Sequence, residues 1–181
     1  RDEVYPLLGF EDSIFRNEFR SADTLRGYIT DEAAFDKVIE TYEELDDKGP
    51  FFTFLVTMQN HGGYSQDWDD FERTVKVEGM DVPRAEAYLT LIKETDNALK
   101  DLISYFEQCD EKTVILMFGD HQPNVETGFL ESLYGKDYER LSEEELSRRY
   151  ITPFVLWANY DIEEERGVQI SANYLSGLLM E

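Results

Sequence analysis

Residues 112–123 read KTVILMFGDHQP, and this stretch decides the fold. Its first seven residues form an apolar run rich in strand formers. Such a run is typical of a strand buried on both faces, as in a parallel sheet. Asp120 and His121 follow the glycine that closes the run. The stretch therefore predicts a buried strand that delivers two polar side chains to one edge of a sheet.

Two further apolar runs predict strands, FFTFLVT at residues 51–57 and PFVLWA at residues 153–158. Helical spacing of apolar residues predicts helices at 30–45 and at 87–106, the second opened by Asp81-Val82-Pro83. Strands that alternate with helices are typical of the α/β class. We therefore expect an α/β domain with a mostly parallel sheet and helices on both faces.

Shorter signals mark where helices begin. Thr30 or Asp31 can cap the helix at 30–45. Residues 142–145 read SEEE and form a predicted capping box. Ser171 is a predicted cap for a final helix, and we expect Tyr174 to face inward from it.

Composition narrows the class of protein. Apolar residues make up 41% and aromatic residues 14%, which is typical of a folded domain. The net charge of −23 repels phosphate backbones, so a nucleic-acid partner is not expected. The single cysteine, Cys109, excludes an intrachain disulfide. No run approaches 18 consecutive apolar residues, the length that a membrane span needs.

The two histidines of the chain mark a candidate site. His61 lies in QNHGG, directly after the run at 51–57, and His121 follows the run at 112–118. Ligands of open α/β sheets bind beyond the carboxyl ends of strands. A carboxylate beside an imidazole suits a divalent metal such as Mn²⁺ or Zn²⁺. The alternatives are a solvated loop for Asp120 and His121, and a structural histidine that braces a glycine-rich turn for His61.

A metal site needs three or four protein ligands, and the sequence offers no obvious third one beside Asp120 and His121. Its other acids lie mostly on predicted helix faces. This shortage indicates that part of the site is missing from the chain.

The stretches 51–63, 87–106, 113–123 and 152–159 together resemble the lipoteichoic-acid-synthase-like family. Its members are phosphoglycerol transferases of the sulfatase and alkaline phosphatase superfamily. The resemblance implies that residues 1–181 are the C-terminal part of one sulfatase-like catalytic domain. The segments that carry the threonine nucleophile, an early glutamate and the membrane helices would lie outside the chain.

The resemblance also implies roles for four residues. In this family a divalent cation, usually manganese, is held by the early glutamate, the threonine and a late Asp-His pair, which matches Asp120 and His121. Magnesium or zinc is an alternative. His61 matches a histidine that contacts the substrate phosphate, and Arg1 resembles an arginine that binds glycerol phosphate. The resemblance gives this chain no catalytic nucleophile, so we expect the chain alone to be inactive.

The function implied is transfer of phosphoglycerol from a lipid head group to a glycan or other polymer acceptor, as in lipoteichoic acid synthesis. The parent protein would be anchored in the membrane and work at its extracellular face. A sulfatase or a phosphoethanolamine transferase of the same superfamily is one alternative. A non-catalytic module that binds a glycan or a partner at the cell surface is another.

Overall fold

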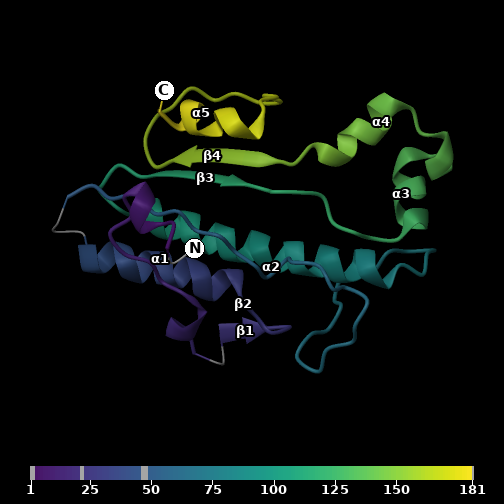
Figure 1. Cartoon of the computed structure of the whole chain (residues 1–181), viewed down its shortest axis with the longest axis horizontal. Coiled ribbons are helices and arrows are strands. Elements are labelled where there is room, and N and C mark those ends of the chain that lie inside the picture. Colours follow the sequence, from purple (N-terminus) through teal and green to yellow (C-terminus); the bar gives the residue numbers. More distant parts are fainter. Residues whose placement is uncertain (1–2, 21–22, 46–48, 181) are drawn as a thin grey trace. The chain divides into compact units, whose positions relative to one another are not determined.

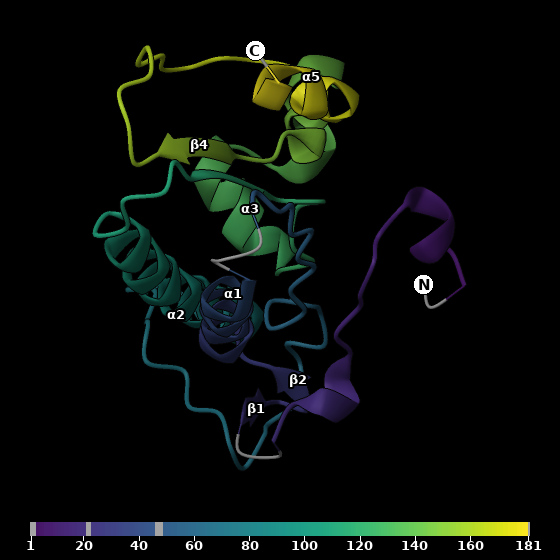
Figure 2. The same ribbon diagram turned by 90° about the vertical axis from the view of Figure 1, so that its left-hand side faces the viewer.

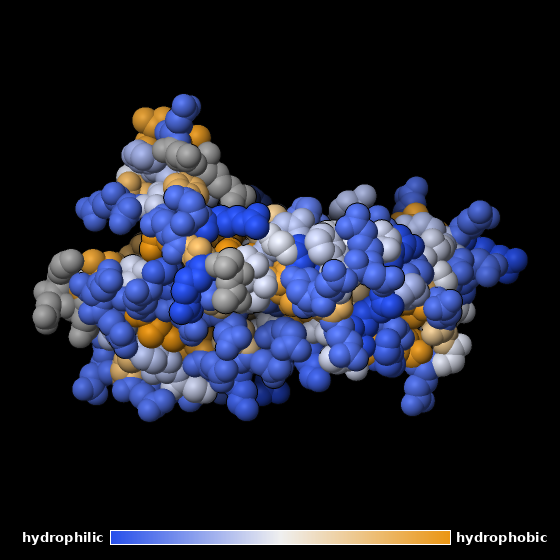
Figure 3. All heavy atoms as spheres, turned by 90° about the horizontal axis from the view of Figure 1, so that it is seen from below, coloured by the Kyte–Doolittle hydropathy of each residue, from blue (hydrophilic) through white to orange (hydrophobic). Residues whose placement is uncertain are grey.

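The structure is a computed structural model that describes residues 3–20, 23–45 and 49–180. The chain divides into two compact units, Arg1–Leu99 and Lys100–Glu181, which are described separately. Among the described residues, no helix has both the length and the apolar character that crossing a membrane requires. Hydrophilic side chains dominate the face drawn in Figure 3, as expected for a strongly acidic chain.

The first unit is built on two helices, α1 (Asp31–Leu45) and α2 (Pro83–Phe106), the second of which continues into the other unit. They lie side by side in both ribbon views (Figures 1 and 2). Thr30 caps α1, because its hydroxyl accepts a hydrogen bond from the Ala33 N–H at 3.2 Å. Two short 3-10 helices, η1 (Pro6–Leu8) and η2 (Arg16–Glu18), precede them.

Before α1 the chain forms a small hairpin. Strand β1 (Thr24–Leu25) pairs antiparallel with β2 (Tyr28–Ile29), and a two-residue turn joins them. Both turn residues, Arg26 and Gly27, have positive φ, 54° and 77°. This combination is typical of a type I′ turn, whose twist matches that of the flanking strands.

The long loop at 58–82 supplies part of the core of this unit. Tyr64 from the loop packs with Ala87 and Leu91 from α2, and all three are buried. Phe71 from the same loop and Leu25 from the hairpin pack against this cluster. The loop is therefore held against the helix by aromatic anchors rather than by regular secondary structure.

The expected strand at 51–57 is not formed, because these residues carry no regular secondary structure. Phe52 and Phe54 are exposed. An apolar run indicates that a segment favours burial, but a strand also needs a neighbouring backbone with which it can form hydrogen bonds. No such pairing is present for this segment among the described residues.

The second unit contains the two other expected strands, β3 (Val114–Phe118) and β4 (Phe154–Ala158). They pair directly, but they are antiparallel, with Val114 opposite Ala158 and Phe118 opposite Phe154. The expectation of a parallel arrangement is therefore wrong for this pair. The expected burial on both faces is also wrong, because every residue of β3 and β4 is half-buried or exposed. The apolar runs predict strands, but they carry no information on strand direction.

The remaining elements of the second unit are short. They are α3 (Thr127–Tyr134), η5 (Tyr138–Arg140), α4 (Glu143–Ser147), η6 (Arg148–Tyr150), η7 (Ala172–Tyr174) and α5 (Leu175–Met180). The capping box is confirmed, since Ser142 accepts from the Glu145 N–H at 3.2 Å and Glu145 accepts from the Ser142 N–H at 2.8 Å.

The prediction for the last helix is wrong in two respects. Helix α5 begins at Leu175, after a 3-10 turn, and the Ser171 hydroxyl bonds the Asn173 side chain instead of a helix N–H. Tyr174 is 63% exposed, whereas Leu175 is buried. The 3-10 turn changes the angular position of each side chain, so the helical stripe read from sequence starts one residue too early.

Candidate functional site

The Asp-His pair lies where the sequence predicts, directly beyond the end of β3. The Asp120 and His121 side chains are 85% and 71% exposed. They converge, with Asp120 Oδ2 and His121 Nε2 3.6 Å apart. The Asp120 Oδ1 atom accepts a hydrogen bond from the His121 N–H at 2.8 Å, which holds the carboxylate in this turn.

Hydrogen bonding fixes the tautomer of His121. Its Nδ1 atom lies 3.0 Å from the carbonyl oxygen of Gln122, and a carbonyl can only accept. Nδ1 therefore carries a hydrogen, and Nε2, on the side of Asp120, is the nitrogen left to bind a metal. Metal-binding histidines typically donate their second N–H to a carbonyl or carboxylate in this way. The donor set of Asp120 and His121 thus fits one divalent cation.

The pair does not complete a metal site by itself. Among the described residues, no three histidine, cysteine, aspartate or glutamate side chains converge closely enough to hold an ion. Further ligands for an ion at Asp120 and His121 would have to come from outside this group of residues.

The backbone at Gly119 passes close to Thr152, and Gly119 does not have a positive φ. A Cβ atom placed on it would lie 3.3 Å from the Cβ of Thr152, which is tighter than nine in ten real contacts, so Thr152 would have to shift by a few tenths of an ångström. Its N–H donates to the Pro153 carbonyl at 3.1 Å and extends the β3–β4 pairing. The Gln122 side chain donates to the Ile151 carbonyl. The turn that carries Asp120 is therefore tied to the segment that leads into β4.

His61 lies in the first unit, on a turn closed by a hydrogen bond from its N–H to the Met58 carbonyl at 3.0 Å. Its ring is exposed, and the Tyr28 hydroxyl lies 3.1 Å from Nδ1. A structural histidine bonded to backbone through both nitrogens would be buried. The observed ring instead has a side-chain partner at Nδ1 and faces solvent.

A network of hydrogen bonds between polar side chains supports the turn that carries His61. Gln59 accepts from the Asp31 N–H at 3.0 Å, and Asn60 donates to the Thr95 hydroxyl at 2.8 Å. Thr95 donates in turn to Asp31 Oδ2 at 2.6 Å. Burial raises the pKa of the Asp31 carboxyl, partly offset by hydrogen bonds from Thr95 and Thr57. The network joins the turn to the start of α1 and to the middle of α2.

Arg26 is a residue of this region that the sequence did not single out. It is only 2% exposed, and its Nη2 atom donates to the carbonyls of His61 at 3.2 Å and Gly62 at 3.5 Å. Its guanidinium lies over three aromatic rings at centroid distances of 5.4 to 5.9 Å. These rings belong to Tyr64, Trp68 and Phe71. Burial lowers the pKa of Arg26. Arg26-Gly27 between short β-forming pairs was the available sequence signal for the hairpin that carries it.

The role of Arg1 and the convergence of His61 with Asp120 and His121 stay predictions. Arg1 lies outside the described residues. His61 lies in the first unit and the Asp120–His121 pair in the second, so their convergence on one cleft remains a prediction.

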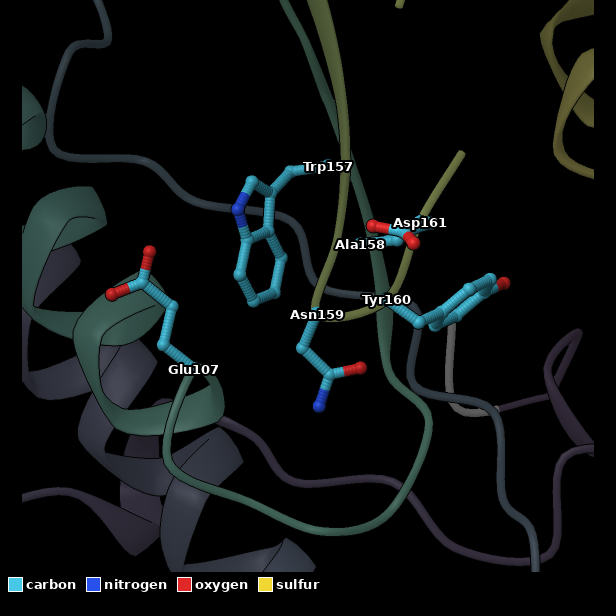
Figure 4. Close-up of a pocket in the computed structure, with 6 residues that line it drawn as sticks. All are labelled: Glu107, Trp157, Ala158, Asn159, Tyr160 and Asp161. Carbon is cyan, nitrogen blue, oxygen red and sulfur yellow. The ribbon is translucent and has the colours of Figure 1, made fainter. Parts of the chain in front are cut away.

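The second unit also has a shallow cavity of about 280 Å³ (Figure 4). Its lining residues are Glu107, Trp157, Ala158, Asn159, Tyr160 and Asp161. The Asn159 amide is already used, since it accepts from the Thr113 N–H at 2.8 Å and donates to the Phe106 carbonyl at 3.1 Å. Asn159 therefore joins the end of α2 to the start of β3, and its amide serves the fold rather than a ligand.

Known proteins share both the sequence pattern and the fold. The sequence profile of the sulfatase family matches residues 1–179. A protein of Rhizobium meliloti (strain 1021) named for cyclic β-1,2-glucan modification is 34% identical in an alignment 186 positions long, which covers 97% of this chain and 28% of that protein. RkpI of the same organism, named as a capsular polysaccharide biosynthesis protein, is 28% identical over 124 residues, 68% of this chain and 21% of that protein.

Among solved structures, Streptococcus pyogenes phosphoglycerol transferase GacH, in complex with sn-glycerol-1-phosphate, superposes with a TM-score of 0.66. The match has 20% identity and covers 92% of this chain and 41% of that chain. This likeness supports the α/β class. The chain spans less than a third of the length of the two Rhizobium relatives.

Proposed function

The chain belongs to the sulfatase family, and we propose that it forms part of an enzyme that transfers phosphoglycerol from a lipid head group to a glycan acceptor outside the cell membrane. The observation that carries this proposal is the turn after β3, where Asp120 and His121 converge to 3.6 Å and Nδ1 of His121 is bonded to a backbone carbonyl, as in metal-binding histidines. Such a pair suits chemistry at a phosphoryl or sulfuryl centre.

The choice of phosphoglycerol over sulfate draws on the comparisons. One solved structure with a similar fold is a phosphoglycerol transferase bound to sn-glycerol-1-phosphate. The two relatives in sequence are named for modification of a glucan and for biosynthesis of a polysaccharide. These names support a carbohydrate acceptor and a place in the cell envelope.

In this proposal Asp120 and His121 hold one divalent cation, for which manganese is our choice, together with ligands from the rest of the protein. Such a cation lowers the pKa of a hydroxyl nucleophile and stabilises charge on phosphoryl oxygens. His61 binds a phosphoryl oxygen of the substrate, and Arg1 binds the glycerol phosphate. The nucleophile, a threonine, comes from outside this chain.

The test uses the whole parent protein with phosphatidylglycerol vesicles, Mn²⁺ and a purified cyclic glucan. Phosphoglycerol on the glucan is measured by mass spectrometry. Asp120→Asn and His121→Ala should each reduce transfer by more than about 100-fold, because each removes a cation ligand. Asp110→Asn, a change at an exposed acid before β3, serves as the matched control and should leave transfer unchanged.

Other outcomes identify the alternatives. Release of sulfate from an aryl sulfate without any phosphoglycerol transfer would identify a sulfatase, and transfer from phosphatidylethanolamine would identify a phosphoethanolamine transferase. Glucan binding with no turnover of any ester would identify a non-catalytic binding module. Each of these results would overturn the proposal.

A further inference from the structure

The hairpin before α1 places one tyrosine beside His61. In the β1–β2 register Leu25 pairs with Tyr28, on either side of the tight turn at Arg26 and Gly27. A two-residue turn leaves little freedom of register, so the position of Tyr28 follows from that of Arg26.

Arg26 fixes the hairpin to the loop that carries His61. Its backbone N–H donates to Asp70 Oδ2 at 2.9 Å, and its guanidinium donates to the His61 and Gly62 carbonyls. The tip of the hairpin is thus bonded to the backbone of the same turn that presents His61. Tyr28 and His61 are therefore held as one structural unit.

The contact between the two side chains is specific. The Tyr28 hydroxyl oxygen lies 3.1 Å from Nδ1 of His61, and the ring centroids are 5.5 Å apart with an interplanar angle of 45°. A neutral imidazole has one donor and one acceptor nitrogen. A phenol has an ordinary pKa of about 10 and is a better donor than a neutral imidazole N–H. Donation from the Tyr28 hydroxyl to Nδ1 is therefore the favoured direction of this hydrogen bond, and it leaves the hydrogen of a neutral ring on Nε2.

We propose that Tyr28 is a positioning residue, which holds His61 in the Nε2–H tautomer so that this N–H donates a hydrogen bond to an anionic oxygen of the substrate. The ring is exposed, so a substrate oxygen can reach it. His121 has the opposite arrangement, because its Nδ1 faces a carbonyl. The two histidines of the chain thus use Nδ1 in opposite ways, as an acceptor at His61 and as a donor at His121. This inference rests on the proposed function, since it takes a phosphoryl group as the substrate.

The first experiment reads the tautomer directly. Nitrogen-15 spectra of the whole parent protein, recorded at a pH where His61 is neutral, should show Nε2 of His61 protonated and Nδ1 unprotonated. In Tyr28→Phe the ring should become a mixture of tautomers, while Tyr174→Phe, a change at an exposed tyrosine of η7, should leave it unaltered. A His61 ring protonated at Nδ1 in the unmodified protein would overturn the proposal.

The second experiment is a double-mutant cycle on phosphoglycerol transfer. Tyr28→Phe should lower kcat/KM by about 10-fold, the range in which a positioning hydrogen bond acts. In a His61→Ala background the same change should have no further effect, because Tyr28 acts only through His61. An equal loss in both backgrounds would show that Tyr28 has a merely structural role and would overturn the inference.

The inference and the proposed function fail separately. If Asp120→Asn and His61→Ala abolish transfer but Tyr28→Phe changes neither transfer nor the tautomer of His61, the inference fails and the proposed function stands. If the unmodified protein transfers no phosphoglycerol, the proposed function fails, whatever the tautomer of His61.

Discussion

Arg26 combines deep burial, a positive φ and a place at the tip of a hairpin. Among the described residues it is the sole non-glycine residue with positive φ. That conformation is unfavourable for a residue with a Cβ atom and persists where surrounding contacts compensate. Here the compensation comes from two carbonyl oxygens, three aromatic faces and the Asp70 carboxylate. Arginine is therefore selected for what its side chain contacts rather than for the turn.

This account predicts a large loss of stability in Arg26→Ala. The change removes hydrogen bonds from a charged donor and the contacts with three rings, so we expect a loss of more than about 2 kcal/mol in the free energy of unfolding. Arg148→Ala is the control, because Arg148 forms an exposed pair with Glu144 and its loss should change stability by less than about 0.5 kcal/mol. Denaturant unfolding measures both, and equal effects would contradict the account.

A second prediction concerns Asp31. Because burial raises its pKa in the folded state, the folded protein binds more protons than the unfolded chain between the ordinary pKa of 3.8 and the raised pKa. Stability should therefore fall as the pH rises from the ordinary pKa through the raised one. Asp31→Asn removes this titration and keeps an oxygen for Thr95, so its stability relative to the unmodified protein should increase over that window.

Thermal unfolding at a series of pH values checks this prediction. Asp36→Asn, a change at an exposed acid on the same helix, is the control and should follow the unmodified protein. A stability difference between Asp31→Asn and the unmodified protein that does not vary with pH would rule out the proposed role of burial.

At the scale of elements, the sequence predicts that a helix or strand is present more reliably than it predicts which strands pair and in which direction. The helices at α1 and α2 and the strands β3 and β4 were all predicted, because each has a periodic or continuous apolar pattern of its own. The strand at 51–57 and the direction of β4 were wrong, because pairing depends on residues far away in the sequence. The β1–β2 hairpin was missed, since its two-residue strands are too short to show a period.

In the candidate site, too, features set by local sequence were predicted and features set by distant residues were not. Asp120 and His121 were predicted from their position after an apolar run, and the turn brings them together. The contacts that position His61 were not predicted, because Tyr28 and Arg26 lie 33 and 35 residues away from it. A motif shows which side chains have suitable chemistry, whereas their tautomers and supports depend on the folded structure.

At the scale of elements, we also predict that the capping box stabilises helix α4. Its capping box satisfies two N–H groups of a helix of five residues, and Lys136 also pairs with Glu145 at 2.7 Å. Ser142→Ala should destabilise the segment by about 1 kcal/mol. Hydrogen exchange at the Glu145 amide measures the loss, and Ser147→Ala, a change at the other end of the helix, is the control. Unchanged exchange at Glu145 in Ser142→Ala would show that the box contributes nothing.

At the scale of the whole molecule, the ligands of the proposed cation come partly from this chain and partly from the rest of the parent protein. The Asp120–His121 pair offers two ligands, and the described residues supply no third in convergence with them. Two ligands do little to offset the dehydration of a divalent ion. We therefore expect the 181-residue chain alone to bind Mn²⁺ weakly and to turn over no phosphoglycerol ester. Submicromolar one-to-one binding in calorimetry would show that the chain contains a complete site.

The last prediction joins the two units. If His61 binds a phosphoryl oxygen of a substrate held by a cation at Asp120 and His121, its ring must lie within roughly 10 Å of that cation, because a phosphoryl group is only a few ångströms across. Mn²⁺ is paramagnetic and broadens nearby resonances, so the carbon-bound ring protons of His61 should disappear when Mn²⁺ is added to the whole parent protein. Mg²⁺ should leave them sharp, and Asp120→Asn should prevent the broadening at the same Mn²⁺ concentration. Sharp His61 resonances in a fully active Mn²⁺-loaded enzyme would place His61 away from the reaction, and the exposed ring beside Tyr28 would then need another ligand.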